Sequence, residues 1–372
     1  MLGLFTVSRT SDHPPPESPS SDEGQQDRAE VAPEDGERDV GDVAERGRDK
    51  KPKGRSRRIV LKAAGGLLAA GALGAAGYAI HDYRQRFGRD ALRTIGDHRI
   101  QLPPGTPPMV VVRGGTPARN ARAAIARLGG MAPFVTPDDV VVVKPNIGWD
   151  SVPAQGANTH PDVVVEVVKA CLDARAKRVI VTDCPVSEAR KAFEKSGILR
   201  AASDAGAEVV LPEHSRYHTV RLSERLGSWS VLEPFVEATK IINVPIGKHH
   251  DFTGVTGGMK NWIGITTERR MSFHSDINRA IAELAALMRP TLTIIDASRV
   301  LMRNGPKGGN LADVKVFGAL AAGVDPIALD AWACRLMDTP DEKLPDYLRF
   351  GEEMGLGKVD YRALQPVEIA AG

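Results

Sequence analysis

Short runs of apolar, largely β-branched residues recur along the chain from Met109 onward, and segments with helical spacing separate them. Several runs are continuous rather than alternating, which is typical of strands whose two faces are both covered. The runs occupy residues 109–112, 140–143, 179–181, 208–211, 240–244, 292–295 and 316–322.

The segments between these runs have the spacing of amphipathic helices. In residues 161–174, apolar side chains such as Val163, Val164, Val167 and Val168 form one stripe, and Pro161 suits the first turn. Further helices are predicted over residues 188–197, 198–205, 277–288 and 326–337. Strands that alternate with helices predict an α/β fold with a mainly parallel sheet, helices on both faces and Rossmann-like layering.

The N-terminal part of the chain has a different composition. Residues 10–55 are rich in Pro, Ser, Gly and charged residues, and no aromatic residue occurs from 6 to 77. Such a stretch buries too little apolar surface to offset the entropy lost on ordering. We therefore predict a disordered extension over residues 1–55.

The heptapeptide Ser56-Arg57-Arg58-Ile59-Val60-Leu61-Lys62 resembles a twin-arginine export signal. An uncharged, weakly hydrophobic run rich in Ala and Gly follows it, beginning at Ala63 and ending at Ile80. The pattern predicts a signal or membrane anchor over residues 56–80, with the Tat translocase as partner of Ser56–Lys62. The alternative is a basic patch before an ordinary Ala-rich helix.

The fate of the signal is left open by the sequence. The small-x-small sites near its end are poor, and 18 uncharged residues suffice to span a bilayer of about 30 Å. The protein is thus expected to be periplasmic or anchored on the extracytoplasmic side, with membrane contact only through residues 63–80. A linker is predicted over residues 81–108 and one domain over 109–372.

Composition narrows the classes of function. The formal net charge is +2 and aromatic residues make up 5%, so neither charge nor stacking surface favours nucleic-acid binding. The three cysteines, Cys171, Cys184 and Cys334, form no CxxC pair, and no cysteine-ligated iron–sulfur cluster is expected. We predict three buried thiols.

Polar residues follow most of the predicted strands. Lys144 and Asn146 follow the run 140–143, Asp183 follows 179–181, and Lys248 and His249 follow 240–244. Ligands of open parallel sheets bind at the carboxyl ends of the strands. The sequence therefore predicts a polar cleft along one sheet edge, with helix caps and turn residues as the alternative.

The segment from residue 252 to 261 is rich in glycine and ends in Lys260 and Asn261, with His274 further on. Glycines let backbone N–H groups approach a ligand, and cationic side chains favour an anion. Asn261 stands where a phosphate-binding P-loop requires Ser or Thr. An anion-binding loop and a plain Gly-rich connector both fit. The loop at residues 304–310 fits either a lid or a long turn.

A divalent metal with N/O ligands is a further hypothesis. His249, His250 and His274 would supply nitrogen, and Asp183, Asp251 or Asp296 would supply oxygen. No HxH or HxxxH spacing supports it, so the fold would have to bring the ligands together.

Taken in order, these motifs resemble those of the DUF362 family, over about residues 110 to 356. They are Lys144-Pro145-Asn146, Thr159-His160-Pro161, Asp183-Cys184-Pro185, Phe193 with Gly197, Lys248-His249, residues 253–261, His274, Asp296, Asn304-Gly305-Pro306, and Asp325-Pro326 with Asp330. The resemblance implies an α/β domain with a polar site at these positions. It implies little chemistry, since the family is named for its unknown function. Many relatives carry a cysteine-rich 4Fe–4S segment, which this sequence lacks, and Cys184 replaces a small or hydroxyl residue.

Two functions remain open. The first is an enzyme acting on a small anionic substrate, with Asp183, His249 and Lys260 as catalytic candidates. Its candidate substrate-binding residues are Lys144, Asn146, Lys248, Asn261 and His274. The second is a non-catalytic module that binds a metal or ligand and assists a redox or cofactor-containing partner.

Overall fold

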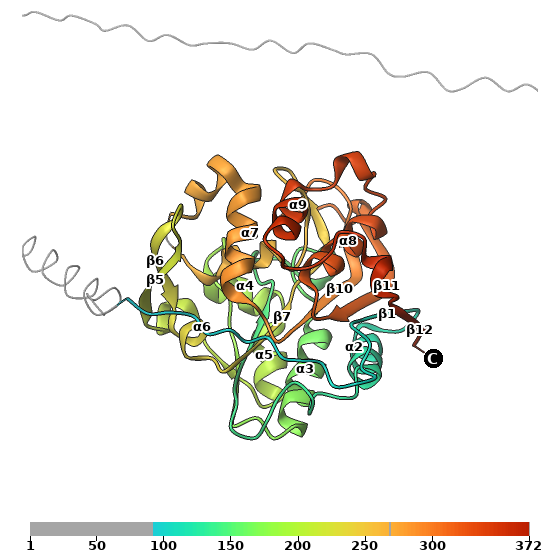
Figure 1. Ribbon diagram of the computed structural model, residues 1–372, viewed down its shortest axis with the longest axis horizontal. Helices are drawn as coiled ribbons and strands as arrows, with labels where there is room; N and C mark the ends of the chain where they lie inside the picture. Colours follow the sequence, from blue (N-terminus) through green and yellow to red (C-terminus); the bar gives the residue numbers. More distant parts are fainter. Residues whose placement is uncertain (1–91, 268, 372) are drawn as a thin grey trace, which may run out of the picture. The chain divides into compact units, whose positions relative to one another are not determined.

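An eight-stranded sheet forms the centre of the domain (Figure 1). The computed structural model describes residues 92–267 and 269–371. The strands lie in the order β12 (Val367–Ala370), β1 (Met109–Arg113), β11 (Val314–Gly323), β10 (Leu292–Leu301), β7 (Lys240–Val244), β2 (Val140–Pro145), β3 (Arg178–Val181) and β4 (Glu208–Val209).

Most neighbouring strands of this sheet pair in parallel. Parallel pairing runs from β10 through β7, β2 and β3 to β4, and β12 is parallel to β1. β11 is antiparallel to both β1 and β10. The predicted α/β fold with a mainly parallel sheet is confirmed.

Helices cover both faces of the sheet. The lower layer in Figure 1 contains α2 (Pro117–Arg127), α3 (Pro161–Asp173) and α5 (Ile198–Asp204), with α4 (Ala189–Lys195) preceding α5. The opposite layer contains α7 (Ile277–Met288), α8 (Pro326–Leu336) and α9 (Asp346–Glu353), with the short α6 (Glu233–Glu237) and the hairpin of β5 (Tyr217–Ser223) and β6 (Gly227–Leu232).

Strand β2 shows why its sequence is continuously apolar. Val141 and Val143 belong to the core cluster that includes residues of α2, α3 and α5, whereas Val142 belongs to the cluster of α7 and the hairpin. Alternate side chains of a strand point to opposite faces, so a strand between two helical layers has no solvent side.

Residues 92–108, the second half of the predicted linker, pack on the domain. Arg93 forms a β-bridge with Val220, and His98 is 2% exposed. The backbone N–H of His98 donates to Arg289 O at 3.2 Å, and Thr291 Oγ1 donates to His98 O at 2.8 Å. The predicted extension, signal and first half of the linker lie outside the described residues.

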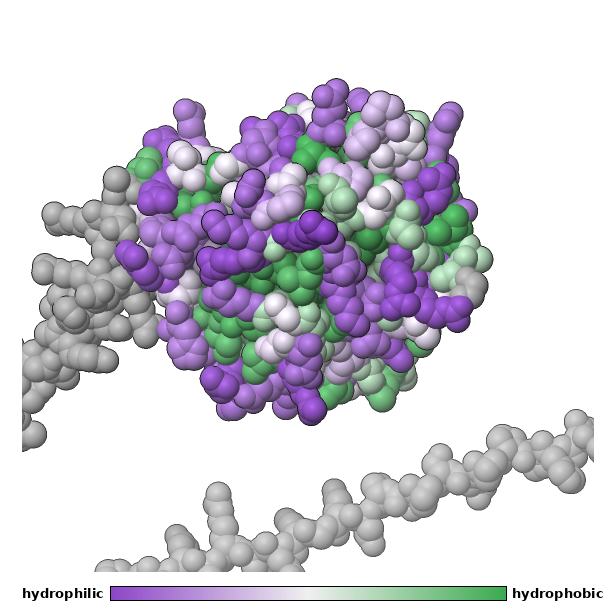
Figure 2. Space-filling model, turned by 90° about the horizontal axis from the view of Figure 1, so that it is seen from below, coloured by the Kyte–Doolittle hydropathy of each residue, from purple (hydrophilic) through white to green (hydrophobic). Residues whose placement is uncertain are grey.

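Several elements were not predicted from the sequence. They are α2, α6, α9, β12, the β5–β6 hairpin and the short hairpin of β8 (Lys248–His250) with β9 (Gly254–Thr256). The described residues contain no helix long and apolar enough to cross a membrane, and the run 63–80 is not among them. Figure 2 views the domain from below, and hydrophilic side chains surround smaller apolar areas there.

Candidate functional site

A buried ion pair joins the carboxyl ends of two neighbouring strands. Lys144 of β2 donates from Nζ to Asp183 Oδ1, just after β3, at 2.7 Å, and their side chains are 0% and 3% exposed. Burial lowers the pKa of Lys144, and the carboxylate opposes that shift. The two residues therefore stabilise each other's charged form in a site without bulk water.

The Asp183 carboxylate also holds two backbone segments. Ile147 N donates to Oδ2 at 2.7 Å, and Cys184 N donates to Oδ1 at 2.9 Å. A Cβ atom at Gly264 would overlap Asp183 Oδ1 and lie 3.0 Å from Lys144 Nζ. Only glycine therefore lets the 3₁₀ segment Lys260–Ile265 pass so close to the ion pair.

Three asparagines extend this arrangement to β7. Asn146 Nδ2 donates to Asn261 Oδ1 at 3.1 Å, and Asn261 Nδ2 donates to Asn243 Oδ1 at 2.8 Å. Asn261 Nδ2 also lies 3.2 Å from Lys144 O. These bonds satisfy the buried amides of Asn243 and Asn261 and fix the ends of β2 and β7 relative to the Lys260 segment.

The three polar side chains of β8 lie on two different sides of the strand. Lys248 and His250 are buried and line a small chamber, whereas His249 does not. His249 Nδ1 instead accepts a hydrogen bond from Gly305 N at 3.1 Å. This follows from the alternation of side chains along a strand.

The chamber that these residues line, here called the inner chamber, has a volume of about 90 Å³. It is lined by Asn146, Gly148, Trp149, Asp183, Cys184, Val186, Lys248, His250, Thr256, Lys260, Asn261, Ile263, Gly264, Arg270 and Pro306. Burial raises the pKa of the Cys184 thiol to about 12, which keeps it protonated at neutral pH.

A larger space, here called the outer chamber, has a volume of about 550 Å³. It shares Trp149, Val186, His250, Lys260, Ile263, Arg270 and Pro306 with the inner chamber. Its further residues are Phe252, Thr267, Arg269, Met271 and His274. The two chambers are therefore adjacent and share a wall.

Positive charge dominates the inner chamber. Desolvation lowers the pKa of Lys260 to about 8, and desolvation with the charge of Lys260 lowers that of Lys248 to about 7. Burial lowers the pKa of His250 to about 2, so its ring is neutral. Arg270 donates to Cys184 O at 2.7 Å and to Pro185 O at 2.5 Å.

The Lys260 ammonium has neither a hydrogen-bond acceptor nor an anionic partner among residues 92–267 and 269–371. Lys248 Nζ donates to Asn146 Oδ1 at 3.2 Å and to Ala157 O, both neutral acceptors. Since Asp183 is neutralised by Lys144, the cations of the chamber lack a counter-ion in this part of the chain.

The glycine-rich loop has a different role from the anion-binding one considered above. Gly258 N and Met259 N donate to the buried carboxylate of Asp330, on α8, at 2.5 and 3.1 Å. A Cβ atom at Gly257 would overlap that carboxylate. The loop amides therefore bind an internal anion, and the loop is a connector fixed by Asp330.

The loop at residues 304–310 is held at several of its residues, and Asn304 Nδ2 donates to Asp313 Oδ2 at 2.7 Å. Besides the bond from Gly305 to His249, Lys307 Nζ lies 3.1 Å from Asp150 Oδ1. Pro306 between them forms a wall of both chambers.

Most residues predicted for the site lie around the inner chamber. Asn146, Asp183, Lys248, Lys260 and Asn261 line it. Lys144 lies behind Asp183, His274 lines the outer chamber, and His249 lies outside both.

His250, Arg270 and Trp149 line the chambers but were not among the predicted catalytic or substrate-binding residues, and His250 was considered only as a metal ligand. Each stands close in sequence to a predicted motif. The alternation of side chains along β8 is the one sequence feature that could have identified His250, because it places His250 on the opposite side of the strand from His249.

The histidines and aspartates considered as metal ligands do not form a cluster in the described chain. Asp296 accepts from His160 N and Ser298 N, which makes it a backbone anchor. Within the described residues, the group of His218, Glu233 and Glu237 has ligand atoms within 4.8 Å of one another. It lies beside the start of β2 and β3, away from the chambers.

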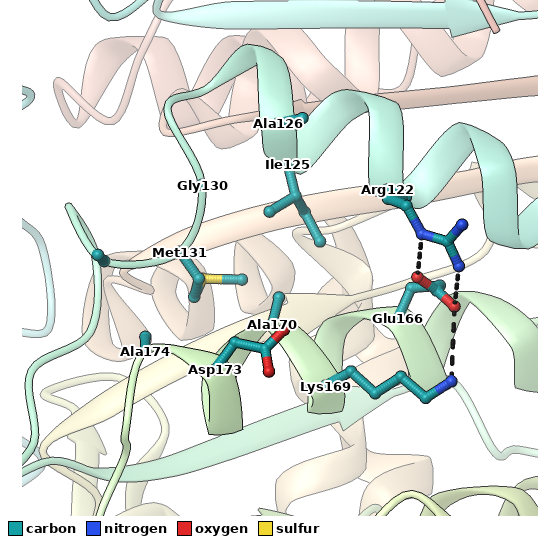
Figure 3. A pocket seen from close by; sticks show the side chains of 11 residues that line it. Arg122, Ile125, Ala126, Gly130, Met131, Glu166, Lys169, Ala170, Asp173 and Ala174 are labelled. Atoms are coloured by element: carbon teal, nitrogen blue, oxygen red, sulfur yellow. Dashed lines mark hydrogen bonds and ion pairs between the residues drawn. The ribbon is translucent and has the colours of Figure 1, made fainter. Parts of the chain in front are cut away.

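Another cavity, of about 440 Å³, lies between the C-terminal halves of α2 and α3 (Figure 3). Arg122 and Lys169 both contact Glu166, at 2.9 and 3.9 Å. Ile125 and Met131 supply apolar walls. In a parallel sheet, the helix after each strand ends near the amino ends of the strands. This cavity is therefore remote from the carboxyl ends of the strands.

Comparison with known proteins gives three similarities. The model of DUF362, a domain of unknown function, matches residues 141–335. Thylakoid-associated protein sll1697 of Synechocystis sp. is 30% identical over 224 residues, which cover 58% of this chain and 68% of that protein. The lactate racemase apoprotein of Thermoanaerobacterium thermosaccharolyticum has a TM-score of 0.33 and 13% identity, over 66% of this chain and 59% of that one. The chain thus spans less than two thirds of the racemase.

The close approach of Gly264 to the ion pair predicts the effect of a single methyl group. Gly264→Ala should lower the free energy of unfolding by about 2–4 kcal/mol, because it displaces Asp183 from Lys144. Urea denaturation of the purified protein measures this change. Gly148→Ala is the control, since its Cβ would lie 3.6 Å from Asn146 Oδ1, an ordinary contact. Equal losses in the two variants would contradict the interpretation.

Proposed function

We propose that this chain, which belongs to the DUF362 family of unknown function, binds a small anionic substrate in the inner chamber and exchanges a proton with it. One observation carries the proposal. Lys248, Lys260 and Arg270 converge on a chamber whose only lining carboxylate among the described residues, Asp183, is already paired with Lys144.

Cations that lose hydration without gaining a counter-ion are costly, because desolvation opposes their charge, and Lys248 is only 2% exposed. An anionic ligand removes this cost by supplying the missing charge. The position of the chamber within the protein also lowers the local dielectric constant, which strengthens the attraction. The fold thus keeps a positive site that a carboxylate or phosphate group completes.

Lys248 is suited to proton transfer. Its lowered pKa of about 7 makes both protonation states accessible near neutral pH. A neutral amine has two N–H groups, and Asn146 Oδ1 and Ala157 O are two acceptors for them. The nitrogen lone pair is then free to take a proton from a bound ligand. Lys260 and Arg270 orient the anion.

A non-catalytic binding module is the second candidate. The same chamber would then hold its ligand without turnover. Deuterium incorporation from D₂O into small carboxylic acids, followed by mass spectrometry, separates the two. Incorporation that Lys248→Met abolishes supports the enzyme, and binding without incorporation supports the module.

Loss of one chamber cation should weaken anion binding. We expect Lys260→Met to raise the Kd of sulfate at least tenfold, since a charged hydrogen bond contributes about 1.5–3 kcal/mol. Isothermal titration calorimetry on the full chain measures it. Lys240→Met, at the opposite end of β7, is the matched control and should leave the Kd unchanged. Unaltered sulfate binding in Lys260→Met would refute the proposed site.

Sulfate affinity should also fall as the pH rises. The free protein loses protons from Lys248 and Lys260 as the pH passes through about 7 and 8, and sulfate keeps its charge. Binding above these values requires proton uptake, so the Kd should rise at least tenfold between about pH 6 and about pH 9. Calorimetry in buffers of different ionisation enthalpy measures the proton uptake directly. A pH-independent Kd without proton uptake would contradict the assignment.

We further propose that the chain is exported by the twin-arginine route and acts outside the cytoplasm. The motif Ser56-Arg57-Arg58 and the uncharged run behind it support this. Replacing Arg57 and Arg58 together by Lys should abolish export of the full chain fused to a C-terminal reporter that is active only outside the cytoplasm. Replacing Arg46 and Arg48 by Lys is the control. Export that persists without the arginine pair would disprove this route.

A further inference from the structure

The outer chamber exposes large apolar side chains. Val186, Phe252 and Met271 are 61%, 64% and 74% exposed, and all three line it. The other large hydrophobic side chains exposed in the described chain are Leu92, Val152, Leu172, Leu311, Val316 and Met354, none of which lines either chamber. Single exposed apolar residues are ordinary, but a group around one hollow indicates a binding surface.

Aromatic and aliphatic side chains complete this surface. Phe252 lies edge-on to the His274 ring, with 4.8 Å between ring centroids. Trp149 and Ile263 belong to the wall shared with the inner chamber. An apolar group in the outer chamber would therefore contact rings and branched side chains from several separate segments.

The sizes of the two chambers differ in a way that suits a two-part ligand. The inner one, about 90 Å³, has the volume of roughly three water molecules, enough for one carboxylate or phosphate group. The outer one, about 550 Å³, lies in the range of pockets that hold small organic molecules. Lys260 and Arg270 line both chambers and so mark where charge meets apolar surface.

We infer that the ligand is an amphipathic anion, in which one carboxylate or phosphate group is joined to an apolar ring or chain. The inference rests on the proposed anion site and names the class of substrate for it. The anionic group contacts Lys260 and Arg270, with Lys248 beside it, and the apolar body covers Phe252 and Met271. A bare anion would leave the apolar wall in water, and a neutral apolar molecule would leave the cations unpaired.

The test compares anions that differ only in an apolar body. The probes for titration calorimetry on the full chain are inorganic phosphate against phenyl phosphate and acetate against benzoate. We expect the phenyl compound of at least one pair to bind at least tenfold more tightly than its bare partner. The pair with the larger gain identifies the head group as phosphate or carboxylate.

Substitutions assign the gain to the outer chamber. Phe252→Ser and Met271→Ser should each reduce the affinity ratio of phenyl to bare anion by at least threefold. Val316→Ser is the matched control, because Val316 is 70% exposed on β11 and lines neither chamber. It should leave the ratio unchanged.

The outcomes separate the two proposals. If neither bare nor phenyl anions bind, or if Lys260→Met weakens none of them, the anion site itself is wrong. If the bare anions bind through Lys260 but both ratios are near one, only the amphipathic ligand is refuted. Binding to phosphatidylglycerol vesicles that Phe252→Ser abolishes, together with ratios near one, would assign the apolar surface to a membrane instead.

Discussion

The buried ion pair between Lys144 and Asp183 is the interaction on which the candidate site depends. Its carboxylate accepts hydrogen bonds from one side chain and two backbone N–H groups, so it fixes the loops after β2 and β3 together. Loss of either partner would leave a charge in a water-free environment, which costs about 3–5 kcal/mol. The pair also determines the chemistry nearby, because it removes the negative charge of Asp183 from the inner chamber. The Asp183 carboxylate thus has a structural role, and the inner chamber keeps the positive charge of its lysine and arginine side chains.

Asp330 has a comparable effect on the glycine-rich loop. Loop amides preceding a lysine resemble an anion site in sequence, but a carboxylate 72 residues away occupies two of them. Its burial raises the pKa of Asp330 to about 7. The anion-binding capacity of the chain therefore lies in side chains, and the backbone serves to place them. Lys260, two residues beyond Gly258, is held at the chamber because the loop before it is fixed to α8.

The sequence predicts the sheet well and the site incompletely, for physical reasons. Continuous β-branched runs identify strands covered on two faces, and the carboxyl ends of parallel strands must share an edge, so Lys144 and Asp183 meet as expected. The β8–β9 hairpin has three-residue strands, too short for a hydrophobic period to identify. Which of His249 and His250 faces the chamber depends on its register, and local sequence does not encode that. The contacts of Asp330 and Arg270 are likewise long-range, so no spacing rule reveals them.

The cost of unpaired cations gives the strongest physical reason to regard the chamber as functional. A chain selected for stability alone would place Met or Leu where Lys248 and Lys260 lose hydration without gaining a carboxylate. The pKa values of their ammonium groups are instead lowered to about 7 and about 8. The neighbouring loop at residues 304–310 is held by His249 and by the Lys307–Asp150 ion pair. The exposed apolar side chains of Val186, Phe252 and Met271 line the adjoining outer chamber. The cations of the inner chamber, which lack a counter-ion among the described residues, thus lie next to the exposed apolar surface of the outer chamber. One ligand with both features satisfies both, which neither a metal ion nor a simple inorganic anion does.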